Sequence, residues 1–475
     1  MSAQFGVVGL AVMGENLALN VERNGFKTAV YNRTWEKTET FLNGRANGKN
    51  FVGSKTLQEF VKSLERPRRI LLMVKAGAPV DDMIAQIKPY LEPGDILIDG
   101  GNSHFPDTDR RVAALAKENL MFFGMGVSGG EEGALWGPSM MPGGDEATWK
   151  HLEPILTKVC AKADGQACVA YCGAKSAGHF VKMVHNGIEY GDMQLIAESY
   201  DLLKYGLGLS APEIQEVFTD WNNGDLKSFL IEITSKIVNF PDDQGGNKPL
   251  VDVILDKAGQ KGTGKWTTVA ALDLGVPVPT MTAAVDARIM SGFKDTRVIA
   301  HKAYGTNIQP LKVSAEEKKA WINKIRSALY ASKICSYAQG FVLLNAASKE
   351  YGYGTRLGEM ARIWKAGCII RAVFLDSIKQ AFDRNPNLAN LLLDESFKGE
   401  IQKREAAWRD TVGLSLKHGF ATPAMAASLA YFDTFKRDRL PANVIQGQRD
   451  YFGAHTYERT DKPGTFHTNW IGRKD

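Results

Sequence analysis

The first third of the chain alternates short apolar runs with stretches of helical period. The apolar runs lie at 5–10, 27–32, 68–76, 95–102 and 121–130. Because such alternation is typical of βαβ units, it predicts a mainly parallel sheet with helices between the strands. We therefore predict an α/β domain over residues 1–176.

Beyond Ser176 the apolar positions follow a helical period that continues to about Arg437. One long helix is predicted from Ser176 to Gly206, and another over 318–349. A chain of 475 residues is too long for a single core. We predict a large all-helical domain over residues 177–435, so the fold class is α/β plus all-α.

The last residues, 436–475, are predicted to form an extended C-terminal tail. Within them, the stretch 440–470 combines aromatic side chains with proline, glycine and threonine, and it shows little helical periodicity. Aromatic side chains on a segment that forms no core need another surface to pack against. Either the tail folds back on its own subunit, or it embraces a partner subunit and contributes Arg449 and His455 to the neighbour's site.

Composition narrows the class of protein. Hydrophobic residues make up 44% and charged residues 23%, and no apolar run approaches the roughly 20 residues of a membrane helix. The net charge of +5 is small, and the basic residues form no run of the kind that binds nucleic acid. Neither the five cysteines nor the eight histidines show a metal-ligand spacing. We expect a cytoplasmic protein with reduced thiols, and no signal peptide, metal, membrane segment or nucleic-acid partner.

The first apolar run ends in the turn GLAVMG, which precedes a helical stretch. Gly9, Ala11 and Gly14 occupy the three positions at which a dinucleotide fold carries glycine. The place of this turn between a strand and a helix favours a dinucleotide site over an ordinary tight turn. We predict a Rossmann-type domain in which the cofactor contacts the whole turn, namely Gly9, Leu10, Ala11, Val12, Met13 and Gly14.

The end of the second run predicts which dinucleotide binds. In proteins that bind NAD an acidic residue here contacts the ribose 2′-hydroxyl, whereas this chain has Asn32, Arg33 and Thr34. A guanidinium can pair with a 2′-phosphate, so Arg33 favours NADP over the alternative of a loop arginine in solvent. We expect further strand ends to contribute to the same site, through Val74, Lys75, Ala76 and Asn102.

Residues 126–144 are dense in glycine and follow the fifth apolar run. Ser128, Gly129 and Gly130 offer a hydroxyl and bare backbone N–H groups to a carboxylate or a phosphate. We predict a loop that is ordered by function rather than a flexible connection.

The predicted long helix carries polar side chains on one face. Lys182, His185, Asn186, Glu189 and Tyr190 follow a spacing that places them together. A solvated face is one interpretation, but the mixture of His, Asn and Tyr with one Lys and one Glu slightly favours a binding or catalytic site.

A cluster of cations lies further along the chain. Lys261, Thr263, Lys265 and Trp266 fall in a predicted glycine-containing loop, and Arg288 follows. The residues alone do not separate a phosphate-binding cradle from a turn with surface lysines.

Together these motifs resemble the 6-phosphogluconate dehydrogenases. The resemblance covers nearly the whole chain and rests on GLAVMG, NRT, GVSGGEEGA, KMVHNGIEYGDMQ, QKGTGKWT and QRDYFGAHTYE. It implies a homodimer in which the C-terminal tail reaches the partner subunit. The implied reaction is the NADP-dependent oxidative decarboxylation of 6-phosphogluconate to ribulose 5-phosphate and carbon dioxide, without a metal, in the pentose phosphate pathway.

The resemblance also implies residue roles. Lys182 is expected to be the general base and Glu189 the general acid. Burial and neighbouring cations are expected to lower the pKa of Lys182 so that it can accept a proton. The sugar acid is expected to bind Asn102, Ser128, Gly129, Gly130, His185 and Asn186, and its phosphate end Tyr190, Lys261, Arg288, Arg449 and His455.

The sequence leaves two competing hypotheses. An enzyme acting on a smaller β-hydroxyacid, such as a 3-hydroxyisobutyrate dehydrogenase, would share the first domain and the lysine, but it would be shorter and would need no phosphate cradle. A non-catalytic NADP-binding or RNA-associated protein would be favoured by loss of Lys182 or Glu189, and both residues are present.

Overall fold

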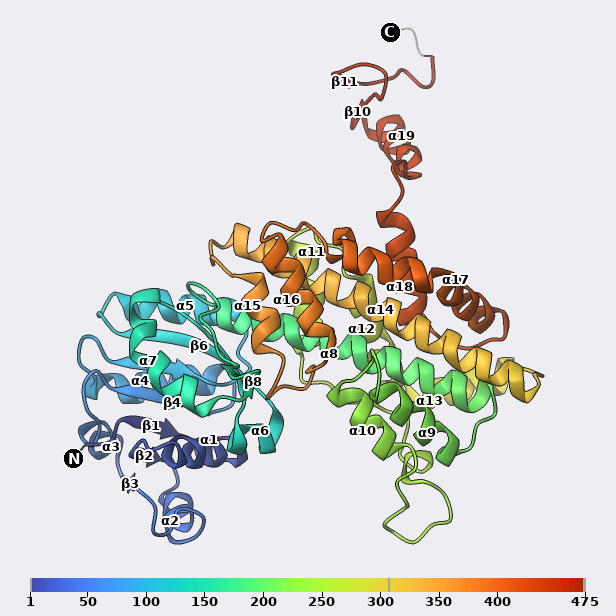
Figure 1. Ribbon diagram of the computed structural model, residues 1–475. Helices are drawn as coiled ribbons and strands as arrows, with labels where there is room; N and C mark the ends of the chain where they lie inside the picture. Colours follow the sequence, from blue (N-terminus) through green and yellow to red (C-terminus); the bar gives the residue numbers. More distant parts are fainter. Residues whose placement is uncertain (1, 306–307, 473–475) are drawn as a thin grey trace. The chain divides into compact units, whose positions relative to one another are not determined.

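The computed structural model describes residues 2–305 and 308–472. The chain divides into two compact units, the first ending at Ser428 and the second beginning at Leu429. The first unit holds both the sheet and most of the helices (Figure 1). The predicted division between residues 176 and 177 falls inside this unit and stays a prediction.

A seven-stranded sheet forms the first part of the chain, in the order β3-β2-β1-β4-β5-β6-β7. All neighbouring strands are parallel except β6 and β7, which are antiparallel. The strands are β1 (Phe5–Val8), β2 (Thr28–Tyr31), β3 (Phe51–Gly53), β4 (Arg69–Leu72), β5 (Ile96–Asp99), β6 (Met121–Ser128) and β7 (Ser139–Gly143).

The five apolar runs correspond to β1, β2, β4, β5 and β6, so those predictions are confirmed. Strands β3 and β7 had no such signal, because β3 spans three half-buried residues and β7 lies within the glycine-dense stretch and contains Pro142. The prediction of a loop over residues 126–144 is wrong for most of its length, since a helix, α6 (Gly130–Trp136), and β7 both lie there.

Helices cover both faces of the sheet. One apolar cluster joins the sheet to α1 (Val12–Arg23), α2 (Trp35–Asn43), α6 and α7 (Glu146–Val159). A second cluster on the other face joins it to α3 (Leu57–Lys62), α4 (Ala78–Ile87) and α5 (Phe105–Ala116). Neighbouring strand residues such as Val7 and Val8 enter opposite clusters, as the two-residue period of a strand requires.

Helix α8 (Ala177–Asp201) connects the sheet to the helical part and continues as a π-helical turn over Leu202–Gly206. The predicted helix from Ser176 to Gly206 is therefore confirmed. Glycines let α8 lie directly on β6, because a Cβ at Gly126 would stand 2.3 Å from the Cβ of Lys182, and one at Gly178 would stand 2.1 Å from the carbonyl oxygen of Gly124. This close packing buries α8 on nearly all sides.

The helical part is built around α8 and α14 (Ala315–Glu350), which pack against each other. A buried ion pair joins them, since Lys333 Nζ lies 2.6 Å from Asp192 Oδ2. Within the described ranges, none of the helices has the length and apolar character that crossing a bilayer requires. The other helices here are α9 (Ala211–Asn222), α10 (Phe229–Ile237), α11 (Thr263–Asp273), α12 (Pro279–Gly292), α13 (Lys294–Tyr304), α15 (Leu357–Ile363), α16 (Phe374–Arg384), α17 (Glu395–Lys417) and α18 (Pro423–Phe435).

The second unit contains a helix that the sequence pattern did not predict. Helix α19 (Ala442–Gly453) is followed by a short hairpin of β10 (Tyr457–Glu458) and β11 (Thr465–Phe466). The expectation of little helical structure is wrong here, because a buried carboxylate rather than an apolar stripe organises the segment. The carboxylate of Asp450 accepts hydrogen bonds from the backbone N–H groups of Thr456 and Thr468, from His467 Nδ1 and from Trp470 Nε1.

Candidate active site

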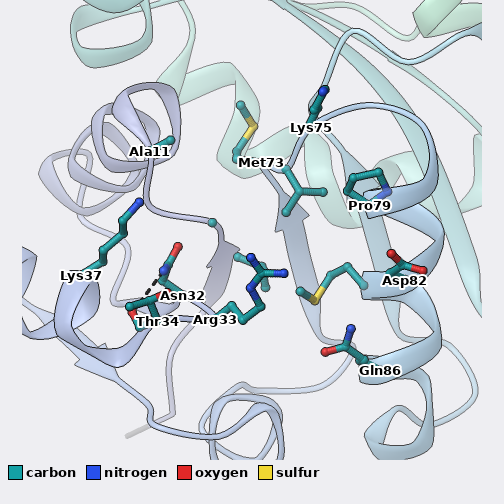
Figure 2. Close-up of a pocket in the computed structure, with 14 residues that line it drawn as sticks. Ala11, Asn32, Arg33, Thr34, Lys37, Met73, Lys75, Pro79, Asp82 and Gln86 are labelled. Atoms are coloured by element: carbon teal, nitrogen blue, oxygen red, sulfur yellow. Dashed lines mark hydrogen bonds between the residues drawn. The ribbon is translucent and has the colours of Figure 1, made fainter.

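A cavity of about 400 Å³ lies at the carboxyl ends of β1, β2 and β4 (Figure 2). This is where the strand order of the sheet reverses, which is the usual ligand position in an open α/β sheet. Its lining includes the predicted residues Gly9, Ala11, Asn32, Arg33, Thr34, Val74 and Lys75. Its lining does not include Leu10, Val12, Met13, Gly14, Ala76 or Asn102, so their contacts with a cofactor stay predictions.

The turn between β1 and α1 has no room for side chains at two of its three glycine positions. Gly9 has a φ of +96°, and a Cβ there would stand 2.5 Å from the carbonyl oxygen of Met73. A Cβ at Gly14 would stand 1.9 Å from the carbonyl oxygen of Gly9. Ala11 is exposed at the start of α1, so a methyl group is tolerated at the middle position.

Cationic side chains line this cavity. Figure 2 shows Arg33 reaching across it from the β2 side, with Lys37 and Lys75 at its margins. Asn32 joins the end of β2 to the turn after β1, since its Oδ1 accepts a hydrogen bond of 3.1 Å from Leu10 N. This arrangement fits an anionic dinucleotide with an additional phosphate on the β2 side. The sequence analysis did not predict Lys37, although a second cation four residues after Arg33 could have indicated a further contact with an anionic cofactor.

The polar face of α8 is buried against β6 rather than exposed to solvent. Lys182 and His185 are 6% and 0% exposed. Lys182 Nζ donates a 2.6 Å hydrogen bond to Asn186 Oδ1, and His185 Nδ1 lies 3.1 Å from the same oxygen. His185 Nε2 lies 3.4 Å from Ser128 Oγ at the end of β6. The structure therefore brings together Lys182, His185, Asn186 and Ser128, as the sequence predicted.

Burial shifts the two candidate acid–base groups in opposite directions. It lowers the pKa of Lys182, and the negative charge of Glu189 opposes part of that shift. The same cause raises the pKa of Glu189, against the opposing effects of Lys182 and Arg288 and with a further rise from Asp192. Burial thus favours the neutral amine of Lys182, as expected from the sequence, whereas the expected contribution of neighbouring cations is absent among the causes of its pKa shift.

His185 is neutral near pH 7. Burial lowers its pKa well below the ordinary value, and the charge of Lys182 lowers it further. Its Nδ1 lies 3.1 Å from Asn186 Oδ1 and 3.4 Å from Lys182 Nζ, and its Nε2 lies 3.4 Å from the Ser128 hydroxyl, so the ring connects Ser128 to the lysine. The carboxylate of Glu189 lies 3.9 Å from the same ring at Nδ1.

A second group of predicted residues meets at the next turn of α8. The guanidinium of Arg288, on α12, lies 3.8 Å above the ring of Tyr190. The start of α11 packs on the other side of Tyr190, where a Cβ at Gly264 would stand 2.5 Å from the ring. Thr263 Oγ1 accepts a 3.1 Å hydrogen bond from Asn186 Nδ2, so α11 is tied to the polar face of α8.

The predicted loop over residues 261–266 is only partly a loop. Lys261 is exposed and precedes α11, whereas Thr263, Lys265 and Trp266 form the first turn of that helix. Gly262 makes this possible, because it stands at the N-cap with a φ of +96°. The glycines that suggested a loop therefore mark a helix start.

Residues near 364–368 pack under the site and were missed by sequence reasoning. A Cβ at Gly129 would stand 2.6 Å from the carbonyl oxygen of Gly367, so Gly129, with a φ of +123°, allows close contact. The ring of Trp364 lies 5.5 Å from that of His185. Nothing in the local sequence links this segment to Ser128, because more than 200 residues separate the two.

The remaining predicted residues lie elsewhere. Asn102 is exposed in the loop after β5. Arg449 and His455 belong to the second unit and are exposed within it, so their contribution to the substrate site stays a prediction. Across residues 2–305 and 308–472, His, Cys, Asp and Glu side chains form no group of three or more that could hold a metal ion.

Two family models match almost the whole chain. Residues 4–173 match the NAD binding domain of 6-phosphogluconate dehydrogenase, and residues 178–470 match the 6-phosphogluconate dehydrogenase C-terminal domain.

Similar proteins extend over the same length. A decarboxylating 6-phosphogluconate dehydrogenase of Synechococcus elongatus is 59% identical over 470 residues, which cover 98% of this chain and 99% of the relative. The NADP(+)-dependent, decarboxylating enzyme of Bacillus subtilis is 56% identical, with 98% and 99% covered. The solved 6-phosphogluconate dehydrogenase of Plasmodium falciparum, studied as apo enzyme and with NADP+ and 6-phosphogluconate, gives a TM-score of 0.95 at 46% identity, with 98% and 100% covered.

Proposed function

This chain belongs to the family of decarboxylating 6-phosphogluconate dehydrogenases, and we propose that Lys182 and Glu189 perform the proton transfers of its reaction. The protein is an NADP-dependent oxidoreductase that oxidises and decarboxylates 6-phosphogluconate. Oxidation at C3 gives a β-keto acid, and loss of C1 as carbon dioxide then leads to ribulose 5-phosphate.

The cavity beside β1, β2 and β4 fits NADP, which accepts the hydride from C3 when bound. Arg33 and Lys37 supply positive charge for the ribose phosphate. The bare backbone at Gly9 and Gly14 allows close approach of the pyrophosphate to the start of α1.

Lys182 acts as the general base in the oxidation. Hydride loss from C3 requires the C3 hydroxyl to give up its proton, so Lys182 must enter this step neutral. Burial lowers its pKa in the required direction. Asn186 Oδ1, at 2.6 Å from Nζ, holds the amine in place through a neutral contact. After the proton transfer the ammonium faces the new C3 carbonyl oxygen.

The same ammonium assists decarboxylation. Loss of carbon dioxide leaves an electron pair that moves onto the C3 oxygen, where a charged Lys182 stabilises it and returns the proton. The product of this step is an enediol. Glu189 then protonates the carbon that carried the lost carboxylate, and its raised pKa keeps it protonated to a higher pH than an exposed glutamate.

The remaining residues hold the substrate. Ser128, Asn186 and the neutral ring of His185 orient its hydroxyl and carboxylate groups around Lys182, with Gly129, Gly130 and Asn102 beside them. Arg288 and Tyr190 stand at the opposite end of the polar face of α8 and bind the phosphate together with Lys261.

The observation that carries this proposal is the buried polar face of α8, where Lys182 Nζ lies 2.6 Å from Asn186 Oδ1 and the Glu189 carboxylate lies 3.9 Å from His185. The opposite pKa shifts of Lys182 and Glu189 agree with a base and an acid acting in sequence. Purified protein is incubated with 6-phosphogluconate and NADP, and the absorbance of NADPH and the trapped carbon dioxide are both measured. We expect equal amounts of the two. NADPH without carbon dioxide would overturn the decarboxylation, and no turnover by folded protein would overturn the function.

Arg33 tests the cofactor assignment. Replacing Arg33 with Met removes one charge-assisted contact, so the Kd for NADP should rise about 10- to 100-fold while that for NAD changes little. Lys55→Met is the matched control, because the Lys55 ammonium lies over the ring of Trp35 and does not line the cavity. Equal losses for NADP and NAD would contradict the role of Arg33 in reading the extra phosphate.

We further infer a homodimer in which the tail contacts the partner subunit. The second unit exposes large apolar side chains, and an apolar groove of about 460 Å³ lies along α19. The first unit also exposes Leu272, Phe293, Ile299 and Tyr304. Such surfaces are typical of protein interfaces. The buried free cysteines support a reducing, cytoplasmic location.

Truncation before Leu440 tests this assembly. We expect the truncated chain to lose activity and to associate more weakly in analytical ultracentrifugation. Arg449→Met, which keeps the tail, should leave the dimer intact and raise the KM for 6-phosphogluconate. A fully active monomer lacking the tail would refute the inference.

A further inference from the structure

Arg111 is a buried arginine that joins two walls of the active site. It lies on α5 and is 2% exposed. Its Nε and Nη2 donate hydrogen bonds of 2.9 Å to the two carboxylate oxygens of Asp81, and Nη2 donates a third, of 3.0 Å, to the carbonyl oxygen of Gly77. Such a bidentate contact fixes both position and orientation.

These contacts hold the cofactor side of the site. Gly77 caps α4 and Asp81 lies in its first turn, and the same helix carries Pro79, Asp82 and Gln86 to the nucleotide cavity. Figure 2 shows these three side chains as the wall opposite Arg33. The position of Arg111 therefore sets the position of that wall.

The other side of Arg111 faces the loop that carries Asn102. Its Nη1 lies 3.5 Å from Asp99 Oδ2, at the end of β5, and it has no hydrogen-bond partner. Asp99 is fully buried and shapes the loop, since its carboxylate accepts a 3.0 Å hydrogen bond from Gly101 N and a 2.6 Å hydrogen bond from Ser103 Oγ.

Asp99 also reaches the catalytic helix. Its backbone oxygen lies 3.1 Å from His179 Nε2, and the other ring nitrogen of His179 lies 2.7 Å from Thr108 Oγ1 on α5. His179 stands one turn before Lys182 on α8. One connected set of buried polar groups thus links α4, the Asn102 loop and the catalytic helix.

We propose that Arg111, acting through Asp81 and Asp99, is a positioning residue that sets the distance between the bound nicotinamide and C3 of the substrate. The proposal rests on the function proposed above. Arg111 lines neither the nucleotide cavity nor the polar face of α8; it aligns the two surfaces that do, through Asp81 on one side and through the charge of Asp99, 3.5 Å from its Nη1, on the other. Misplacement by about 1 Å can cost on the order of 100-fold in rate.

Arg111→Lys tests this role in the full-length protein. Lysine keeps the charge but cannot bridge Asp81 and Asp99 together. We expect kcat to fall about 10-fold or more. With substrate deuterated at C3, the kinetic isotope effect on kcat should increase, because hydride transfer becomes rate-limiting. The matched control is Arg110→Lys, since Arg110 also binds Asp81 through two 3.0 Å contacts but is exposed and does not face Asp99.

The outcomes separate the possible failures. A purely structural role would reduce the amount of folded enzyme without changing the isotope effect, and this result would overturn the proposal. If Arg111→Lys does not fold, Asp99→Asn provides the same measurement, because the amide oxygen still accepts from Gly101 N while the charge facing Arg111 is lost. An unchanged isotope effect in Asp99→Asn would also overturn the proposal that Arg111 is a positioning residue. Absence of turnover by the unsubstituted protein would refute the proposed function instead.

Discussion

Each half of α8 contacts one buried lysine, and the two lysines have different partners. In the first half, Lys182 meets the neutral amide of Asn186 at 2.6 Å. In the second half, Asp192 pairs with Lys333 of α14 at 2.6 Å and also accepts a hydrogen bond from Tyr337. Both lysines are almost inaccessible, at 6% and 2% exposed. Both lysines are therefore buried, and they differ in whether the partner of the ammonium group is a neutral amide or a carboxylate.

This difference separates the lysine that we propose to be catalytic from one that joins two helices. A carboxylate partner stabilises the ammonium form and opposes deprotonation. The neutral partner of Lys182 adds no charge to stabilise the ammonium, and the more distant Glu189 offsets only part of the desolvation, so the pKa of Lys182 is lowered. Gly126 of β6 brings the first half of α8 against the sheet, whereas Gly191 and Asp192 in the second half contact α14.

Lys182→Met gives the largest effect and leaves the fold intact. Turnover should fall about 1,000-fold or more, because general-base catalysis contributes on the order of 100- to 10,000-fold and the ammonium for decarboxylation is also lost. Stability should hold, since methionine fills similar volume and no carboxylate is left unpaired. The Kd for NADP is measured by calorimetry and should not change. Lys175→Met, at an exposed lysine just before α8, serves as the control.

Lys333→Met should show the opposite behaviour. It leaves the Asp192 carboxylate buried without its charge partner, so the free energy of unfolding should fall by about 3–5 kcal/mol. Urea denaturation measures this loss. The double variant Lys333→Met/Asp192→Leu should recover most of it, because no unpaired charge remains. Turnover per folded molecule that fell as far as in Lys182→Met would break the contrast between the two halves.

Glu189→Gln sharpens the contrast within the first half of the helix. The amide keeps the shape but cannot donate the proton to the enediol, so formation of ribulose 5-phosphate should slow by about 100-fold. When the reaction runs in deuterated water, the unsubstituted enzyme should place deuterium on one face of the carbon that carried the carboxylate. In Glu189→Gln this stereospecificity should be lost. Glu198→Gln is the control from the second half, because Glu198 accepts hydrogen bonds from the backbone of Ala424 and Met425 and should affect stability alone.

The smallest expected effect is a shift in pH dependence. Lys182 must be neutral to accept a proton, so the rate of oxidation rises as the pH rises through its pKa. The Glu189 carboxylate raises that pKa, in opposition to burial. Removing this charge in Glu189→Gln should therefore move the rising limb of the pH–rate profile to lower pH. A move to higher pH would contradict the electrostatic coupling of the two residues.

The sheet and the cofactor turn were readable because their signals are local. Gly9, Ala11 and Gly14 lie together in one turn, although the contact that requires Gly9 is with Met73 after β4, and Arg33 follows the next strand directly. Five of the strands carried continuous apolar runs, while β3 and β7 did not. The start of α11 was read as a loop because Gly262 and Gly264 suggested flexibility, although one caps the helix and the other makes room for Tyr190.

The amino-acid sequence alone was enough to predict the chemical groups of the site. These are the dinucleotide turn, the cations that follow along the chain, and one helix face with Lys182, His185, Asn186 and Glu189. Periodicity suffices for this, because residues three and four apart share a face in any helix. Three further facts were visible only in the tertiary structure: this face is buried on β6, Lys333 pairs with Asp192, and the ring of Trp364 packs near that of His185. These contacts join residues far apart in the chain, and desolvation, which sets the pKa of Lys182, exists only once the surrounding elements have packed.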